Sequence, residues 1–305
     1  MSNAYLIVQN DVQAIRQFDS TIPDSGIRRL YCHQYCCASA AVFLVSTTYL
    51  SACLCFKNAE LYLSEWLAFY TILGVEHFYL YDNESEDAFE HFLEPFRSRG
   101  MVTLLRYPGR GVQRGIYEHC LRTFGPKTRW LLFCDDDEFL FPARDHPLPE
   151  ALLPYERFAG VGVAWAMYGS SGHVTRPPGL VIQNYLRRAA VPDPHVKCIV
   201  NPARVVEPIL AAHQFRARGG LVVDEKFHPL RGPFAPLPTI DVLRINHYCT
   251  KSRDELRERR SRVQVNTGQK SPLSLDDWVR LDETYNEIED SVALRYVARV
   301  RELIG

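Results

Sequence analysis

The chain has 305 residues, of which 47% are hydrophobic and 23% charged, the composition of an ordinary folded protein with a sizeable core. Its 35 Lys and Arg against 36 Asp and Glu give a formal net charge of -1. This argues against a general nucleic-acid binder, because no basic excess is available to displace counterions from phosphates.

The first part of the chain carries two ambiguous features. The cluster Cys32-His33-x-x-Cys36-Cys37 has zinc-ligand residue types but lacks a second ligand pair, which disfavours a zinc site. The nine cysteines show no disulfide spacing, which favours a reducing, cytoplasmic compartment. The uncharged run 36–56 is long enough to span a bilayer, but its Ser, Thr and β-branched residues favour two consecutive buried strands. No signal peptide is expected, and we predict a soluble chain.

From residue 58 onward, helical and strand patterns alternate. A helix with Leu63 and Leu67 on its buried face is expected to stop at Gly74. Strands are predicted over 75–81, 101–107 and 130–134, and helices over 86–99 and 113–124. The alternation predicts an α/β fold with a mostly parallel sheet and crossover helices. Such sheets bind ligands at the carboxyl ends of their strands, which is where Asn58, Asp82-Asn83 and Asp135 lie.

The second half is less regular. Short strands are predicted over 161–168, 196–200, 221–223 and 241–246. A proline-punctuated loop over 229–238 has the length of a lid or binding loop. A capping box at Ser252–Glu255 predicts the start of a charged helix, and a helical tail is expected from Ser274.

The acidic run Asp135–Glu138 follows an apolar strand and precedes another apolar segment. In an extended strand end, Asp135 and Asp137 would point the same way and Asp136 the opposite way. Carboxylates so close to a core require a positive partner, and Mg²⁺ or Mn²⁺ suits paired carboxylates that leave room for phosphate oxygens. An exposed acidic loop is the alternative.

Three basic side chains stand out in the second half. His247 ends an apolar strand, and the roles of metal ligand and core histidine are both open. Lys251 precedes the predicted helix start, where free amide groups and the helix dipole would add to its charge and form a phosphate seat. Lys197 lies within the strand-like run HVKCIV, where an unpaired lysine is costly, so a phosphate or carboxylate partner is expected.

Two further groups remain ambiguous from the sequence. Lys57-Asn58 and Asp82-Asn83 are either plain turns or hydrogen-bond partners for a nucleobase and ribose. Around the loop 169–172, acceptor contacts are expected from Trp165, Ser171 and His173, with Tyr168 completing a sugar-stacking platform. Each aromatic residue is also a reasonable core residue, and for Trp165 the core is favoured.

Taken together, these stretches resemble family 92 of the glycosyltransferases and the related family-2-like bacterial group. The resemblance begins at Lys57-Asn58-Ala59-Glu60 and Glu65-Trp66 and continues through the segment Gly74–Asn83. It covers the chain from about Leu50 to the C-terminus and leaves the first fifty residues outside. The remaining matching positions are Gln113, Tyr117, Cys120, Trp130, Asp135–Phe139, Gly169–His173, Lys197, His213, Asn246–Tyr248 and Lys251-Ser252.

The resemblance implies a GT-A fold, a Rossmann-like domain over 50–265 with a nucleotide-sugar half at about 50–142 and an acceptor half at about 143–265. Residues 1–49 would form an extension packed on the core, and 266–305 a helical tail. It implies a Mn²⁺ or Mg²⁺ site made by Asp135, Asp137 and His247. The implied nucleotide-sugar contacts are Lys57, Asn58, Asp82, Asn83, Gln113, Asp136, Lys197 and Lys251.

The implied activity is metal-dependent transfer, with inversion, from a UDP-sugar to a glycan or lipid-linked saccharide. UDP-galactose is favoured by resemblance alone. The general base is expected in the acceptor half, with Asp224, Glu225 and His213 as candidates. A metal-dependent phosphohydrolase and a non-catalytic carbohydrate-binding protein remain as alternatives. The expected location is cytoplasmic, with peripheral association at the inner membrane face as an open alternative.

Overall fold

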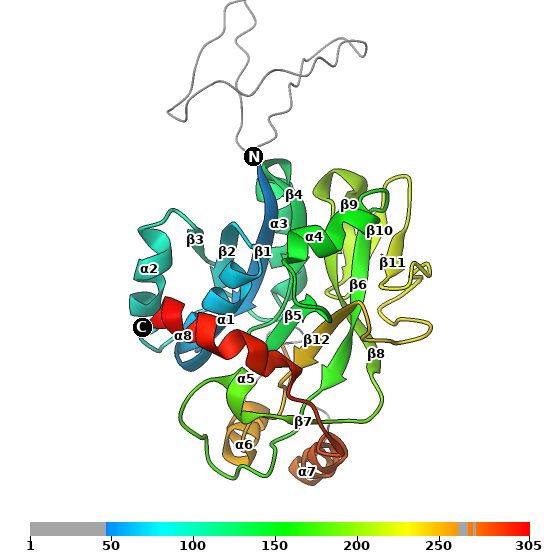
Figure 1. The fold of residues 1–305 in the computed structure, drawn as a ribbon. Coiled ribbons are helices and arrows are strands. Elements are labelled where there is room, and N and C mark those ends of the chain that lie inside the picture. The colour runs from blue at the N-terminus through cyan, green and yellow to red at the C-terminus, as the bar shows by residue number, and fades with distance from the viewer. Residues whose placement is uncertain (1–46, 262–267, 271–272) are drawn as a thin grey trace, which may run out of the picture. The chain divides into compact units, whose positions relative to one another are not determined.

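The computed structural model describes residues 47–261, 268–270 and 273–305. Its centre is a nine-stranded sheet in the order β3-β2-β1-β4-β8-β6-β12-β5, with β11 also paired to β6 (Figure 1). All strands run parallel except β8 and β5, which are antiparallel to their neighbours. The strands are β1 (Thr48–Phe56), β2 (His77–Asp82), β3 (Val102–Arg106), β4 (Thr128–Phe133), β5 (Glu138–Pro142), β6 (Gly160–Met167), β8 (Asp193–Val200), β11 (Val222–Asp224) and β12 (Leu243–His247).

Helices flank this sheet, and two small antiparallel ribbons lie outside it. The helix α8 at the C-terminal end packs against α1, where the rings of Phe69 and Tyr296 lie 5.2 Å apart (Figure 1). The ribbons are β9 (Val205–Ala211) with β10 (Gln214–Ala217) and β7 (Arg187–Arg188) with β13 (Ile288–Glu289). The helices are α1 (Glu60–Ile72), α2 (Glu94–Arg97), α3 (Gln113–Phe124), α4 (Leu148–Leu152), α5 (Val181–Asn184), α6 (Arg253–Ser261), α7 (Leu275–Thr284) and α8 (Val297–Ile304).

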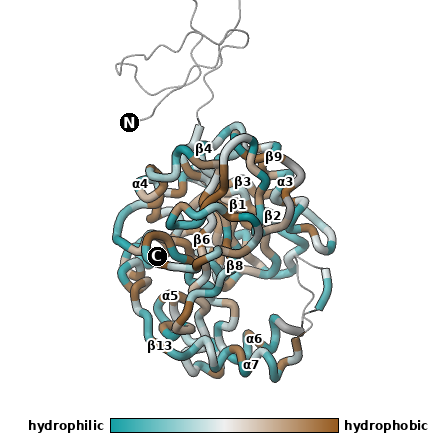
Figure 2. The backbone as a smooth tube through the Cα atoms, turned by 90° about the vertical axis from the view of Figure 1, so that its right-hand side faces the viewer, coloured by the Kyte–Doolittle hydropathy of each residue, from teal (hydrophilic) through white to brown (hydrophobic). Residues whose placement is uncertain are grey.

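Burial explains why these segments form these elements. The strand β1 is buried along its last seven residues, as a central parallel strand covered on both faces must be. In α1, Leu63, Trp66 and Tyr70 recur at helical spacing and are fully buried. Gly74 ends that segment at φ 97°, and a Cβ there would lie 2.9 Å from Pro149. Figure 2 shows hydrophobic positions concentrated along the strands and hydrophilic ones frequent in the outer loops.

These elements confirm the predicted α/β fold class, with a mostly parallel sheet flanked by helices. The helix predicted over 86–99 is wrong in extent: only a 3₁₀ turn at Phe89–Leu93 and the short α2 form. The reason is that Asp87 accepts a hydrogen bond from the Glu60 amide, while Glu60 accepts one from the Ala88 amide. These bonds tie the start of the segment to α1.

Several predictions fall outside the described residues. The cluster Cys32-His33-x-x-Cys36-Cys37 does, and so does the first of the two strands expected in the run 36–56. The second strand is present as β1. No helix in the described part of the chain is long and apolar enough to cross a bilayer.

The sheet brings distant polar segments to one edge. Phe56 at the end of β1 lies beside Asp82 at the end of β2, and β4 ends next to β1 and just before the acidic run. On the other half of the sheet, His247 at the end of β12 pairs with Met167 at the end of β6. The carboxyl ends of these parallel strands therefore meet at one site, as the sequence predicts.

Candidate active site

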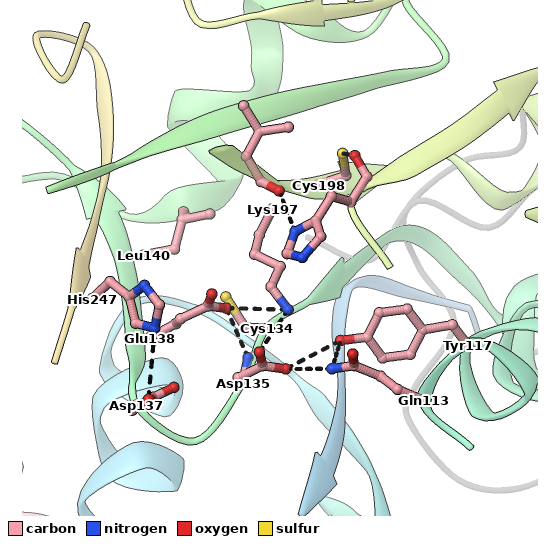
Figure 3. Close-up of polar contacts among 12 residues, drawn as sticks. Gln113, Tyr117, Cys134, Asp135, Asp137, Glu138, Leu140, Lys197, Cys198 and His247 are labelled. Carbon is pink, nitrogen blue, oxygen red and sulfur yellow. Dashed lines mark hydrogen bonds and ion pairs between the residues drawn. The ribbon is translucent and has the colours of Figure 1, made fainter. Parts of the chain in front are cut away.

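The acidic run forms the turn that joins β4 to antiparallel β5. The Glu138 amide donates to the Asp135 carbonyl at 3.2 Å, so Asp135–Asp137 do not continue an extended strand. The expected alternation of side chains is therefore wrong here. Asp135 lies on one side of the turn and Asp137 on the other, as Figure 3 shows.

On the first side, Asp135 joins a buried network centred on Lys197 (Figure 3). Lys197 Nζ lies 2.8 Å from Asp135 Oδ2 and 3.6 Å from Glu138 Oε2, and its side chain is fully buried. The other oxygen of Asp135 accepts a hydrogen bond from Gln113 Nε2 at 2.7 Å and lies 3.4 Å from the Tyr117 hydroxyl. Burial opposes the ammonium, but the two carboxylates hold the pKa of Lys197 well above its usual range. The carboxylate partner expected for Lys197 is confirmed.

On the other side, Asp137 is fully buried and faces His247, with 3.6 Å between Asp137 Oδ2 and His247 Nε2. The partly exposed guanidinium of Arg259, on α6, contacts the same carboxylate oxygen. Burial opposes ionisation, yet Arg259 and His247 hold the pKa of Asp137 well below its usual range. The Oδ1 atom of Asp137 is buried without a hydrogen-bond partner.

A divalent cation fits this second side of the turn. Asp137 presents a buried oxygen without a hydrogen-bond partner, Oδ1, while the His247 imidazole faces its other oxygen, Oδ2, which Arg259 also contacts. Carboxylate and imidazole groups are common ligands of divalent cations. Of the three predicted ligands, the structure brings Asp137 and His247 together, while both oxygens of Asp135 have other partners. No group of three His, Cys, Asp or Glu side chains in the described residues is placed to hold an ion. Phosphate oxygens of a substrate would have to complete the coordination.

Lys251 lies beside the same acidic turn, and its side chain is buried against the Tyr62 ring, with Nζ 3.4 Å from the ring centroid. Burial lowers its pKa, and Asp136 and Asp137 partly oppose that effect. The helix α6 begins as predicted with a capping box between Ser252 and Glu255.

The free amide groups expected at this helix start are absent. The first two backbone amides after Ser252 donate to carbonyls of another loop. The Arg253 amide donates to the His173 carbonyl at 3.1 Å, and the Asp254 amide donates to the Val174 carbonyl at 3.0 Å. The capping box uses the amides of Ser252 and Glu255. The predicted phosphate seat therefore retains only the charge of Lys251.

The residues predicted to hold the nucleoside lie at the ends of β1 and β2, but their polar atoms shape the loops there. Asp82 accepts from the Ser85 amide and pairs with Arg106 at 3.1 Å. Asn83 donates to the carbonyls of Tyr107 and Gly109. The remaining two differ in setting: Asn58 accepts from the Glu86 amide, and Lys57 is exposed. Their contacts with a nucleoside stay a prediction.

The predicted acceptor residues are divided between two places. Ser171 accepts from the amides of Leu186 and Arg187, and His173 lies against Tyr185 and the Asn184 carbonyl. Trp165 instead lies among three histidine rings on the site side of β6. Their centroids are 5.0 Å (His195), 5.4 Å (His213) and 4.4 Å (His247) from that of Trp165.

Two of the three candidate bases lie away from the acidic turn. Asp224 pairs with Gly162, near the start of β6, whereas His247 pairs with Met167 at its end. The five residues between Gly162 and Met167 correspond to about 16 Å along a strand. The Asp224 carboxylate accepts from the amides of Lys226 and His228, and Glu225 accepts from the amides of Asp241, Val242 and Leu243. The structure therefore does not bring these two carboxylates to the site.

The third candidate, His213, does reach the site, next to Trp165. Burial and the nearby Lys197 lower its pKa to about 4. The sequence interpretation missed a further pair on β8, His195 with Asp193. Its signal was the alternation Asp193-x-His195-x-Lys197, which places these side chains on one face of a strand.

Glu65, one of the positions that match family 92, is a buried carboxyl group beside the site. It accepts hydrogen bonds from the amides of Val181 and Ile182 at 2.7 and 3.0 Å. Burial raises its pKa to about 7 against the effect of these bonds, whereas an unfolded glutamate titrates near 4.5. Folding therefore retains a proton between these pH values, and this group costs about 3 kcal/mol of stability as pH rises through that window.

Glu65→Gln is expected to remove this pH dependence. Urea unfolding at pH 5, 6.5 and 8 should show the variant gaining stability relative to the parent protein as pH rises. Glu156→Gln is the control, because Arg129 holds the pKa of Glu156 below its usual value, so its effect stays constant over this range. Parallel stability curves for the parent and Glu65→Gln would contradict the prediction.

Comparisons with known proteins identify the family of this chain. The model of glycosyltransferase family 92 matches residues 49–216. A family 92 protein of Oryza sativa subsp. japonica is 30% identical over 178 residues, 56% of this chain and 30% of that protein. One of Ricinus communis is 27% identical over 184 residues, 56% of this chain and 32% of that protein.

The chain thus spans about a third of the length of the curated relatives it matches. Among solved structures, S. aureus TarS 1-349 in complex with UDP aligns with a TM-score of 0.36 and 14% identity, covering 51% of this chain and 47% of that one. The family model covers more than half of the chain, including the turn with Asp135 and Asp137 and the strand β8 with Lys197. The chain belongs to glycosyltransferase family 92.

Proposed function

We propose that this chain transfers a sugar from a nucleotide-sugar donor, a UDP-sugar, to a hydroxyl of a glycan or lipid-linked saccharide, with inversion at the anomeric carbon. The observation that carries the proposal is the pair Asp137 and His247, with Lys251 beside the same turn, at the carboxyl edge of a family 92 sheet. A cleaved diphosphate needs positive charge at such an edge. Family membership favours this activity over the phosphohydrolase and the binding-protein alternatives.

Some residues of the site would stabilise the leaving group, and others hold these residues in position. Asp137 and His247 would hold a divalent cation, which, when bound, supplies Lewis-acid stabilisation of the leaving diphosphate. Lys251 adds a fixed positive charge in a buried setting, where such a charge acts more strongly than in water. Lys197 holds Asp135 in place from below the site. We place the donor at the ends of β1, β2 and β4 and the acceptor beside β6 and β8.

The proposal includes the extent of the catalytic unit and its location in the cell. The catalytic unit spans about 50–265, with the acceptor half after about 142. The location is cytoplasmic, which the buried thiols of Cys53, Cys55, Cys120, Cys134 and Cys198 support, because reduced cysteines persist in that compartment.

The proposal is tested by calorimetry of UDP, GDP and TDP binding with and without Mn²⁺. One nucleotide, expected to be UDP, should bind more tightly with Mn²⁺, and Asp137→Asn should lose at least about 10-fold of that gain, because a metal ligand is removed. Asp145→Asn is the control, since Asp145 is exposed and pairs with Arg299 away from the turn. Failure of all three nucleotides to bind in either condition would refute the transferase proposal.

A further inference from the structure

A histidine–aspartate pair on β8 lies beside the site and has no assigned role. The amide of His195 donates to Asp193 Oδ1 at 2.9 Å, and His195 Nδ1 lies 2.7 Å from the same oxygen. The ladder between β6 and β8 shifts register here, between Ala164 and Trp165, and such bulges re-aim side chains next to active sites. With Nδ1 bonded to a carboxylate, the neutral ring carries its proton on Nδ1 and its lone pair on Nε2.

Ring contacts connect this pair to the leaving-group side of the site. The His195 ring stacks on Trp165 with 5.0 Å between centroids and 17° between planes. The Trp165 ring also contacts the His247 ring, with 4.4 Å between centroids, and His247 faces Asp137. One side-chain ring thus separates the pair from the groups that would receive the diphosphate. Inversion places the attacking hydroxyl on the face of the donor sugar opposite the leaving group. The base must therefore be set apart from the groups that receive the diphosphate, as His195 is by the Trp165 ring.

The surroundings are suited to a sugar. The His195 side chain is 40% exposed, and the Phe234 ring meets it edge-on at 4.6 Å. Trp165 Nε1 is buried without a hydrogen-bond partner, and a sugar hydroxyl would satisfy it. The titratable groups facing His195 are Asp193 and, 6.1 Å away between ring centroids, His213. The low pKa of His213 leaves it a weak base near neutral pH.

We propose that His195, oriented by Asp193, is the general base that activates the acceptor hydroxyl; this inference rests on the proposed glycosyl transfer. His195 Nε2 takes the hydroxyl proton while the acceptor oxygen bonds to the anomeric carbon. The bond from that carbon to the diphosphate breaks, and its electron pair stays on the diphosphate. The imidazolium, paired with the Asp193 carboxylate, then returns its proton to solvent.

The first test uses the sugar nucleotide that contains the nucleotide found to bind by calorimetry. It measures release of that nucleotide, with Mn²⁺ present and water as the probe acceptor. His195→Asn should lower kcat by about 100-fold or more, lose the acidic limb of the pH–rate profile and leave nucleotide affinity unchanged. Added imidazole should restore part of the rate to His195→Asn. Asp193→Asn should lower kcat without changing nucleotide affinity.

The matched control is His228→Asn. His228 is also paired with an aspartate, Asp224, at 2.9 Å and is 45% exposed, but it lies at the far end of the sheet from the turn. Equal kcat values for His195→Asn and His228→Asn would overturn the inference and leave the transferase proposal intact. A parent protein that neither binds nor releases any nucleotide would refute both.

A second measurement needs no substrate. In the neutral form of the His195 ring, nitrogen chemical shifts should show the proton on Nδ1 and none on Nε2. The opposite tautomer would overturn the inference. So would a signature that persists in Asp193→Asn and is lost only on unfolding, because Asp193 would then not orient the ring.

Discussion

Lys197→Met is expected to lower the free energy of unfolding by about 3–5 kcal/mol, the cost of removing one partner from a buried ion pair. Its ammonium is the cation in contact with both Asp135 and Glu138, at 2.8 and 3.6 Å, and Glu138 is fully buried. Methionine keeps an unbranched apolar stem, one atom shorter than that of lysine, and removes the charge together with its hydrogen-bond donors. Urea unfolding at pH 8 measures the loss, and adding Glu138→Gln should recover much of it.

The loss should also depend on pH in a defined direction. Burial raises the pKa of Glu138 to about 7, and removal of Lys197 raises it further, whereas an unfolded glutamate ionises near 4.5. Folding of the variant therefore retains a proton over a longer pH range, so stability is lost as pH rises. The cost should be smaller at pH 5.5 than at pH 8.

Lys226→Met is the control for this series. Lys226 pairs with Asp241 at 3.1 Å, but both side chains are more than a third exposed, and such pairs contribute at most about 1 kcal/mol. A cost for Lys197→Met no larger than for Lys226→Met would show that the buried network does not stabilise the fold.

Local patterns predicted most of the fold. The helix Gln113–Phe124 and the capping box at Ser252 have the expected bounds, since both depend on residues close in sequence. The strand β4, predicted over 130–134 and observed over Thr128–Phe133, and the parallel order of the first half follow from alternating apolar segments. The segment 86–99 departs from its pattern because its start exchanges hydrogen bonds with the start of α1: the Ala88 amide donates to the Glu60 carboxylate, and the Glu60 amide donates to the Asp87 carboxylate.

The site was predictable as a place and less so as a set of contacts. The strand pattern placed Asn58, Asp82-Asn83 and Asp135 at the carboxyl edge of the sheet. The family resemblance added Lys197, His247 and Lys251 to the same site. The sequence could not show that a turn would send Asp135 and Asp137 to opposite sides, because that depends on the antiparallel pairing of β5 with β12.

Long-range backbone partners account for two further departures. The amides at the start of α6 are taken by the carbonyls of His173 and Val174, about 80 positions earlier in the chain. Asp224 and Glu225 are used by loop amides, a role that short acidic side chains in irregular segments often have. The alternation Asp193-x-His195-x-Lys197 could have drawn attention to this pair, because alternate residues of a regular strand share a face. The register shift of β8 against β6 at this point could not be predicted from the sequence.

Lys251→Met is expected to reduce kcat by 10²–10³-fold, on the order found when one preorganised charge-stabilising group is removed. With the amides of α6 already bonded, the Lys251 ammonium is what remains of the predicted phosphate seat. Its buried position against Tyr62 fixes the charge before the reaction, so no reorganisation is needed as the diphosphate leaves. Because the charge on the diphosphate grows during cleavage, kcat should fall more than nucleotide affinity.

The substitution is matched to the backbone of this position. Lys251 has φ 51°, and methionine meets the same left-handed strain as lysine, so the variant should fold. Burial lowers the pKa of Lys251, which means the ammonium is costly there, and its loss should destabilise the chain less than Lys197→Met does. Steady-state nucleotide release and calorimetry would be compared with Lys226→Met and with Lys251→Arg, which keeps the charge and should recover part of kcat. If Lys251→Met weakened nucleotide binding and kcat/KM equally while kcat stayed unchanged, Lys251 would act in ground-state binding and not on the leaving group, because only a contact that strengthens as the bond breaks can change kcat.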